Sequence, residues 1–184
     1  RIIDSIFDTY LKEKYDTETV DLIRLSALLH DVTHIPFGHT LEDEARILAK
    51  HDKSDRIEKV IKKLTNEIRS SEDYPYLSLG VPSRKDFDYV KSLLKNVPDV
   101  LWTIALHDKD EKDLGEDLRR KPRLAKDKYF IADIIGNTIS ADLFAYTKRD
   151  VEFTGIDKTP GGYRIFDYLE LAKDEEGRTR LAIR

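Results

Sequence analysis

The chain has 184 residues, of which 40% are hydrophobic and 37% charged, and its formal net charge is −4. These values exclude a disordered polyelectrolyte, and they give no overall basic field that would favour binding to nucleic acid. Cysteine is absent, so disulfides and thiolate metal sites are excluded, and a metal ion would have to bind His, Asp or Glu.

Length and hydropathy predict one domain over residues 1–184, which at this size buries about 70% of its unfolded surface. No apolar run approaches the ~18 residues of a membrane-spanning helix, and no signal peptide is present, so we expect a soluble cytoplasmic protein without a membrane span. Methionine is absent even at the start of the chain, and we therefore expect a fragment of a longer protein.

Helical periodicity dominates the first part of the chain. It predicts a helix over residues 2–11 and a second, capped by Asp16 or Thr17, that runs to Leu29. The second helix is apolar on most faces, so we expect it to be a central helix that is buried on most faces. Pro36 and Gly38 predict a tight loop. Thr40 with Asp43 fits a helix capping pair, which predicts a third helix over 41–50.

Helices continue in the second part, followed by a change of pattern at the end of the chain. We expect a fourth helix from Ser54 and a fifth over 87–97, and residues 100–106 form an apolar segment. The charged stretch 107–123 predicts a surface loop, and one long helix is expected over 128–150. Residues 163–184 predict a β-hairpin appendage. The predicted fold is thus mostly α, a helical bundle with a small C-terminal β-hairpin.

Three of the five histidines fall in HDVTHIPFGH, residues 30–39. A lone His-Asp pair is usually a surface or capping feature, but three histidines at the mouth of an apolar helix favour a functional site. Imidazole and carboxylate together suit Zn, Fe, Mn or Ni, and Mg where carboxylates and waters dominate. The sequence therefore predicts a divalent metal site that includes His30 and Asp31.

Two ligands leave a catalytic metal site incomplete, because such sites usually have three or four protein ligands. The best distant donors lie in residues 139–150, where positions i, i+4, i+7 and i+8 share one helical face. These positions hold Asp142, Tyr146, Arg149 and Asp150. Spacing alone leaves open whether this stripe is a solvated outer face. For His51, a place at the negative end of a helix is already a sufficient structural reason.

These residues together resemble the HD-domain phosphohydrolase superfamily, and more narrowly its branch of deoxynucleoside triphosphate triphosphohydrolases, which includes bacterial dGTPases and the vertebrate SAM-and-HD-domain enzyme. The signature HD-x-x-H-x-P-F-x-H is complete over residues 30–39. His51-Asp52, the pattern from Ile139 to Asp150, and the stretch from Gly155 onward extend the similarity. It covers the chain from about residue 20 and is weakest between 70 and 125.

The resemblance implies a role for each matching residue. His30, Asp31 and Asp142 would be metal ligands. One histidine of the phosphate site would protonate the leaving oxygen, and three substrate-binding residues would lie along the late helix. The phosphate-site histidines are His34, His39 and His51, and the substrate-binding residues are Tyr146, Arg149 and Asp150.

The implied activity is hydrolysis of a dNTP to a deoxynucleoside and triphosphate, by a protein that assembles into homo-oligomers. Two departures stand against this pattern. The family's first metal histidine would precede Arg1, and Leu143 stands where the vertebrate enzyme has a lysine. Two alternatives therefore stay open: an inactive HD-fold module that senses nucleotides or scaffolds a complex, and an HD nucleotidase that acts on another phosphate ester.

Overall fold

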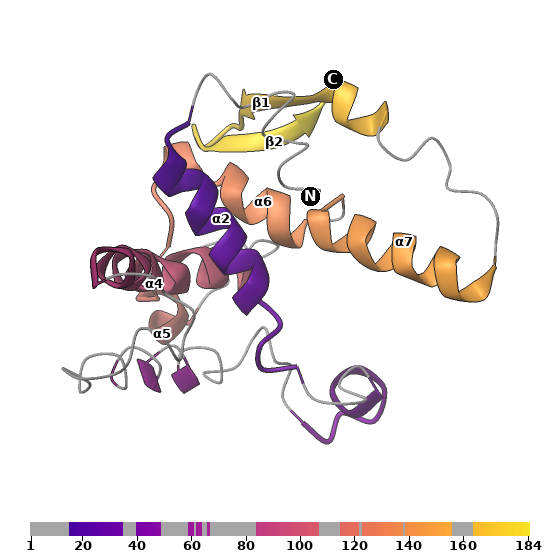
Figure 1. The fold of residues 1–184 in the computed structure, drawn as a ribbon, viewed down its shortest axis with the longest axis horizontal. Helices are drawn as coiled ribbons and strands as arrows, with labels where there is room; N and C mark the ends of the chain where they lie inside the picture. The colour runs from indigo at the N-terminus through magenta and orange to yellow at the C-terminus, as the bar shows by residue number, and fades with distance from the viewer. Residues whose placement is uncertain are drawn as a thin grey trace. The chain divides into compact units, whose positions relative to one another are not determined.

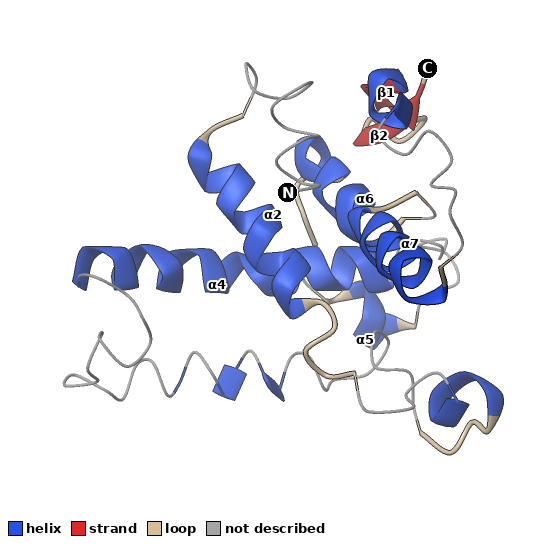
Figure 2. Cartoon of the chain, turned by 45° about the vertical axis from the view of Figure 1, so that its right-hand side comes forward, coloured by secondary structure: helices blue, strands red, loops and turns tan. Residues whose placement is uncertain are grey.

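The computed structural model describes residues 15–34, 40–48, 59–60, 62–63, 66, 84–106, 115–121, 123–137, 139–155 and 164–184. The chain forms two compact units, one of Arg1–Ala27 with Leu124–Arg184 and the other of Leu28–Arg123. Helices predominate, and the strands of the described part form a two-stranded sheet near the C-terminus (Figure 2). The predicted fold class is thus confirmed. The helix predicted over 2–11 and the loop at Pro36 and Gly38 lie outside the described residues.

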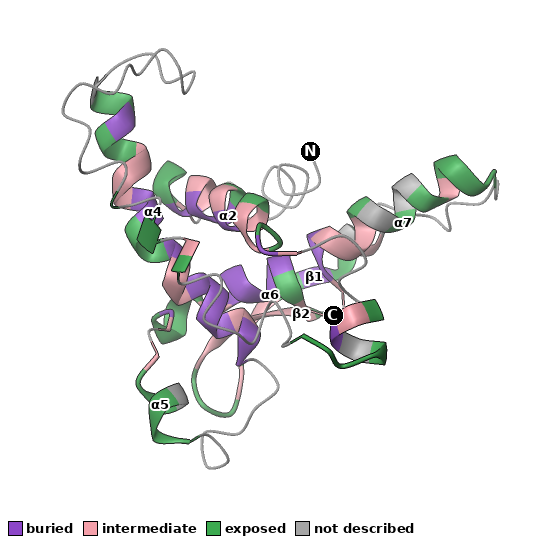
Figure 3. Ribbon diagram, turned by 90° about the horizontal axis from the view of Figure 1, so that it is seen from below, coloured by how far each residue is buried: buried purple, intermediate pink, exposed green. Residues whose placement is uncertain are grey.

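Helix α2, Thr17–Leu29, begins where the sequence predicted. The Asp16 carboxylate accepts a hydrogen bond of 2.8 Å from the Thr19 backbone N–H, as an N-cap residue does. That bond lowers the pKa of Asp16. The prediction that α2 is buried on most faces was wrong, because Leu28 is 75% exposed. Its buried residues follow helical spacing and make one stripe, Thr19, Leu22, Ile23 and Ser26 (Figure 3).

The long helix predicted over 128–150 is two helices, α6 (Phe130–Gly136) and α7 (Ala141–Thr154) (Figure 1). Ser140 causes the new start, because its backbone is extended and its hydroxyl accepts a 3.2 Å hydrogen bond from the Leu143 N–H. Gly155 ends α7 with a left-handed φ of 66°, and its N–H donates to the Val151 carbonyl. The break therefore puts Asp142 in the first turn of a helix rather than in the middle of one.

In the unit of Arg1–Ala27 with Leu124–Arg184, the apolar core centres on α6, in which every residue from Phe130 to Ile135 is buried. The Tyr15 ring packs against the Phe130 ring with centroids 4.5 Å apart, and burial raises the pKa of the Tyr15 hydroxyl. Lys126 lies in a 3₁₀ turn, Lys126–Lys128, that leads into α6, and its ammonium donates to the Glu176 carbonyl of the hairpin turn.

The predicted β-hairpin is confirmed as β1 (Leu169–Lys173) and β2 (Thr179–Ile183), preceded by a 3₁₀ turn over Arg164–Tyr168. The strands are antiparallel, with Leu171 opposite Leu181. Backbone bonds from Asp174 to Arg178 and from Arg184 to Tyr168 fix which pairs are hydrogen-bonded. Since such pairs alternate, Leu171 and Leu181 form a non-hydrogen-bonded pair, and the Leu181 N–H points away from β1.

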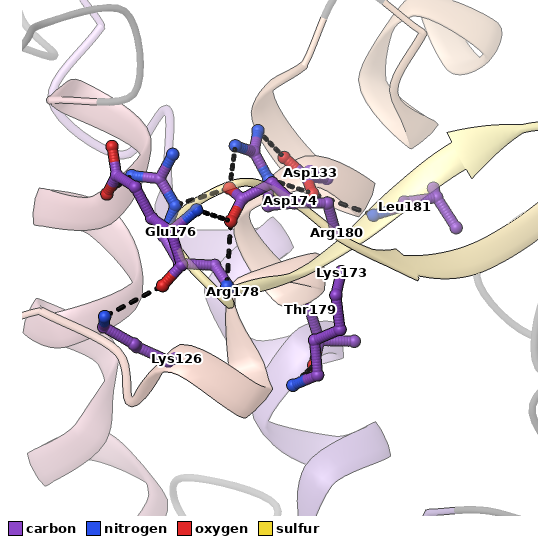
Figure 4. A network of polar contacts seen from close by, with 9 residues as sticks. All are labelled: Lys126, Asp133, Lys173, Asp174, Glu176, Arg178, Thr179, Arg180 and Leu181. Atoms are coloured by element: carbon purple, nitrogen blue, oxygen red, sulfur yellow. Dashed lines mark hydrogen bonds and ion pairs between the residues drawn. The ribbon is translucent and has the colours of Figure 1, made fainter.

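The carboxylate of Asp133 accepts a hydrogen bond from that N–H at the edge of β2 (Figure 4). Its Oδ2 accepts from the Leu181 N–H at 2.9 Å and from the Arg180 Nε at 2.8 Å, and its Oδ1 accepts from the Arg180 Nη2 at 2.7 Å. The Asp133 side chain is fully buried, so these three bonds compensate for the cost of burying its charge. They attach α6 to the hairpin.

In the second unit, one helix, α4 (Arg84–Ala105), contains both the predicted fifth helix and most of the apolar segment over 100–106. Pro98 lies inside α4, where it removes one helical hydrogen bond without ending the helix. A buried face that includes Val97, Val100 and Leu101 explains why the helix continues. The Lys121 ammonium lies 4.5 Å from the centroid of the Trp102 ring.

Two further predictions in this unit need correction. The helix predicted over 41–50 is a short π-helical turn, Thr40–Glu44, and Arg46 then takes a positive φ of 53°. The charged stretch predicted as a loop contains one helical turn, α5 (Glu116–Arg119). Most of the fourth predicted helix lies outside the described residues, and those described at 59–60, 62–63 and 66 are helical. Of the described helices, none combines the length and apolar character needed to cross a bilayer.

Removing the Asp133 carboxylate tests the attachment of α6 to the hairpin. Asp133→Ala leaves Arg180 and the Leu181 N–H without their acceptor, and we expect a loss of about 3 kcal/mol in the free energy of unfolding. The matched control is Glu170→Gln, which removes an exposed 3.3 Å ion pair to Arg184. The control should cost less than about 1 kcal/mol. Urea unfolding followed by circular dichroism measures both, and equal losses would contradict the attachment.

Ionisation of Asp174, in the turn of the hairpin, makes the stability of the fold depend on pH. Burial alone raises its pKa, but hydrogen bonds from the Arg178 side chain and backbone, the Arg178 charge and the Glu176 N–H outweigh that and lower the pKa from 3.8 to about 2. Because the folded value lies below the unfolded one, ionised Asp174 stabilises the fold fully above about pH 5, and this contribution disappears as the pH falls through about 2. The free energies of unfolding of wild type and of Asp174→Asn should therefore become equal as the pH falls over that range. A constant difference would be the contrary result.

Candidate metal centre

The residues after α2 fold into two overlapping turns. The Val32 N–H donates to the Leu29 carbonyl at 3.1 Å, and the His34 N–H donates to the Asp31 carbonyl at 2.8 Å. His30 and Asp31 directly follow the last residue of the helix, so helix and turn together fix where their backbones lie. Both residues lie next to the carboxyl end of α2, where the helix dipole favours positive charge.

The His30 and Asp31 side chains approach each other, with 3.4 Å between Nε2 and Oδ2. The imidazole is 20% exposed and the carboxylate 48% exposed, so the imidazole is the more enclosed of the two groups. An imidazole nitrogen beside a partly exposed carboxylate oxygen is a donor pair that suits a divalent cation.

Asp142 is the third residue of this group. It lies in the first turn of α7, where the Ser140 cap starts the helix, and its side chain is half-buried. One ligand atom from each of His30, Asp31 and Asp142 lies within 4.8 Å of the other two. Atoms bound to one ion at ~2.1 Å lie at most ~4.2 Å apart, and the limit of 4.8 Å within which these three atoms lie is close to that span. One imidazole nitrogen and two carboxylates therefore fit a divalent metal.

The other predicted site residues divide into three groups. His34 is described and is held through its backbone by the Asp31 carbonyl, whereas His39 and His51 lie outside the described residues. Asp150 lies on α7 and is exposed. Tyr146 and Arg149 have backbones in α7, but their side chains lie outside the description. Asp150 thus has the exposure of a solvated or substrate-facing group.

Sequence reasoning missed Ser140, whose cap sets the position of Asp142. The available signal was Gly136-Asn137 with Ser140 three residues later, which is a helix-stop pattern followed by a helix-start residue.

The chain matches a known protein family. The family model described as HD domain matches residues 8–135, which is more than half of the chain and includes His30, Asp31 and His34. Asp142 lies beyond the matched span. A search of curated proteins found none that matches the chain. The length of the family match, with the His-Asp pair inside it, shows that this chain belongs to the HD-domain family.

Proposed function

We propose that the protein is a metal-dependent phosphohydrolase that converts a dNTP to a deoxynucleoside and triphosphate. Membership of the HD family supports metal-dependent phosphoester hydrolysis. The dNTP substrate is supported by the resemblance of the motif over residues 30–39 and of the late helix to the triphosphohydrolase branch. The observation that carries the proposal is the approach of His30, Asp31 and Asp142 to one another.

These three residues would hold the ion, His30 through an imidazole nitrogen and the two aspartates through carboxylate oxygens. Candidate ions for such donors are Mn, Fe, Ni, Zn and Mg. When bound, the ion neutralises charge on phosphate oxygens and lowers the pKa of a water molecule, which makes a nucleophile available near neutral pH. The Ser140 cap contributes by holding the first turn of α7, and with it the Asp142 backbone, in place.

A proton donor for the leaving oxygen is the other requirement of this chemistry. Histidine titrates near neutral pH and can act as a general acid. His34 is the described candidate, because the turn closed by its N–H holds it close in the chain to the His30–Asp31 pair. His39 and His51 are candidates from the motif alone. Tyr146, Arg149 and Asp150 are proposed to bind the substrate from the face of α7 that begins with Asp142.

Turnover of nucleotides by an Asp142 variant tests the proposal. The protein encoded by the whole gene is incubated with a dNTP panel and Mn or Mg, and products are separated to distinguish triphosphate from single phosphates. Asp142→Asn removes one charged ligand, and we expect kcat to fall by more than about a hundredfold. Glu152→Gln changes an exposed carboxylate of the same helix and should leave turnover unchanged.

Each contrary outcome points to a different conclusion. Unchanged turnover in Asp142→Asn would eliminate this residue as a ligand. Release of a single phosphate instead of triphosphate would identify an HD nucleotidase that acts on another phosphate ester. A wild-type protein without bound metal or turnover with any added metal would identify a module that senses nucleotides or scaffolds a complex.

Replacement of His34 separates proton transfer from metal binding. His34→Gln keeps a hydrogen-bonding side chain but removes the titrating group, so kcat should fall by about 10²–10⁴-fold. Affinity for Mn, measured by titration calorimetry, should stay at the wild-type value because His34 is not a proposed ligand. A parallel loss of Mn affinity would show that His34 acts on the metal instead.

A further inference from the structure

The two outer edges of the hairpin differ in their hydrogen bonding. On β2, the Leu181 N–H donates to Asp133 of α6, so β2 lies between β1 and α6 (Figure 1). On β1, the alternation of hydrogen-bonded pairs directs the N–H and C=O groups of Leu169, Leu171 and Lys173 away from β2. Among the described residues, none forms a hydrogen bond with these outward groups. We call the outward N–H and C=O groups of these three residues the β1 edge.

The charged side chains of β1 do not block this edge. An open strand edge is a template for pairing with another strand, and native proteins often protect it with charged side chains or proline. β1 has no proline, and both of its charged side chains reach toward β2. The Lys173 ammonium donates to the Thr179 hydroxyl at 2.7 Å, and the Glu170 carboxylate lies 3.3 Å from the Arg184 Nε. The β1 edge is therefore accessible to a further strand.

We propose that the β1 edge pairs with the β1 edge of a second copy of this chain, antiparallel, so that two hairpins form one four-stranded sheet. A two-fold axis at Leu171 gives the pairing. It puts Leu171 opposite Leu171 of the second copy, and Leu169 opposite Lys173 of the second copy. In this register every outward group of both edges is hydrogen-bonded. The inference goes beyond the proposed function and does not depend on it.

The neighbouring registers are less favourable, because each pairs fewer outward groups and opposes like charges. An axis at Glu170 puts that carboxylate opposite its own copy, and an axis at Ala172 puts Glu170 opposite Asp174. The axis at Leu171 opposes no like charges within β1. It also extends the Leu171–Leu181 pair of each hairpin into a row of four leucines on one face. Both leucines are only half-buried in one chain, so the row buries further apolar surface.

Cross-linking through a single cysteine tests this pairing. The 184 residues contain no cysteine, so Leu171→Cys adds one thiol at the axis. Cα atoms of such a pair lie about 5.5 Å apart, within the range of a disulfide. The matched control, Leu181→Cys, has similar burial and lies on the same face, but about three strand spacings, ~14 Å, from its counterpart.

The measurement is the rate of covalent dimer formation in the full-length protein with oxidised glutathione, followed on non-reducing gels. We expect Leu171→Cys to cross-link at least about tenfold faster than both Leu181→Cys and wild type. Cross-linking also traps a weak dimer, so the test does not need a high affinity.

Opposite charges at the axis give a second test. Leu171→Lys and Leu171→Glu each oppose like charges, so each should raise the dimer dissociation constant at least about tenfold in analytical ultracentrifugation. An equimolar mixture of the two variants opposes an ammonium and a carboxylate and should associate more tightly than either variant alone. Because association of the mixture requires folded hairpins, it separates lost pairing from lost folding.

Three results would overturn the proposal. The first is equal cross-linking of Leu171→Cys and Leu181→Cys. The second is a monomeric wild type with no cross-linking of Leu171→Cys, because the β1 edge then either stays open or pairs with a strand other than a second β1. The third is a dimer that neither Leu171→Lys nor Leu171→Glu weakens, which would place the interface on another surface. None of these measurements uses nucleotide turnover, so failure of the proposed function would leave this inference standing.

Discussion

The buried carboxylate of Asp133 is the interaction from which the geometry of its unit follows. A charge without solvent contact is tolerated because Arg180 and the Leu181 N–H donate three hydrogen bonds to it. Because those donors lie on β2, the carboxylate fixes where α6 meets the strand edge. α6 leads through four residues into α7, so the same attachment sets the origin of the helix that carries Asp142. The hairpin is thus attached to the helical part of this unit.

The candidate metal centre uses two helix ends of opposite polarity. His30 and Asp31 follow the carboxyl end of α2, where the helix dipole attracts a cation. Asp142 lies in the first turn of α7, where the dipole stabilises a carboxylate. The pair of turns after Leu29 holds the residues at the end of α2, and the Ser140 cap holds the start of α7. Fixed backbones of this kind keep ligands in place before an ion binds, which lowers the entropic cost of binding.

Short sequence patterns correctly predicted the elements that depend on interactions between residues close in the chain. Asp16 capped α2 as expected, and the hairpin formed where alternating residues flank a Gly-containing turn. Sequence reasoning was wrong where packing overrides local preference. Pro98 is an expected helix breaker, yet α4 continues because residues on both sides of it bury one apolar face. Conversely, the periodicity from 128 to 150 concealed the break before Ser140, and no local pattern shows that Asp133 pairs with Arg180. The HDVTHIPFGH motif itself can be read from the sequence, whereas the approach of Asp142 depends on the fold.

A crystal structure of the full-length protein grown with Mn, with anomalous data, tests the central claim most directly. The account predicts an anomalous peak about 2.0–2.3 Å from the His30 imidazole and from the carboxylates of Asp31 and Asp142. A peak at other residues, or an ion that His30 and Asp31 bind without Asp142, would contradict the account.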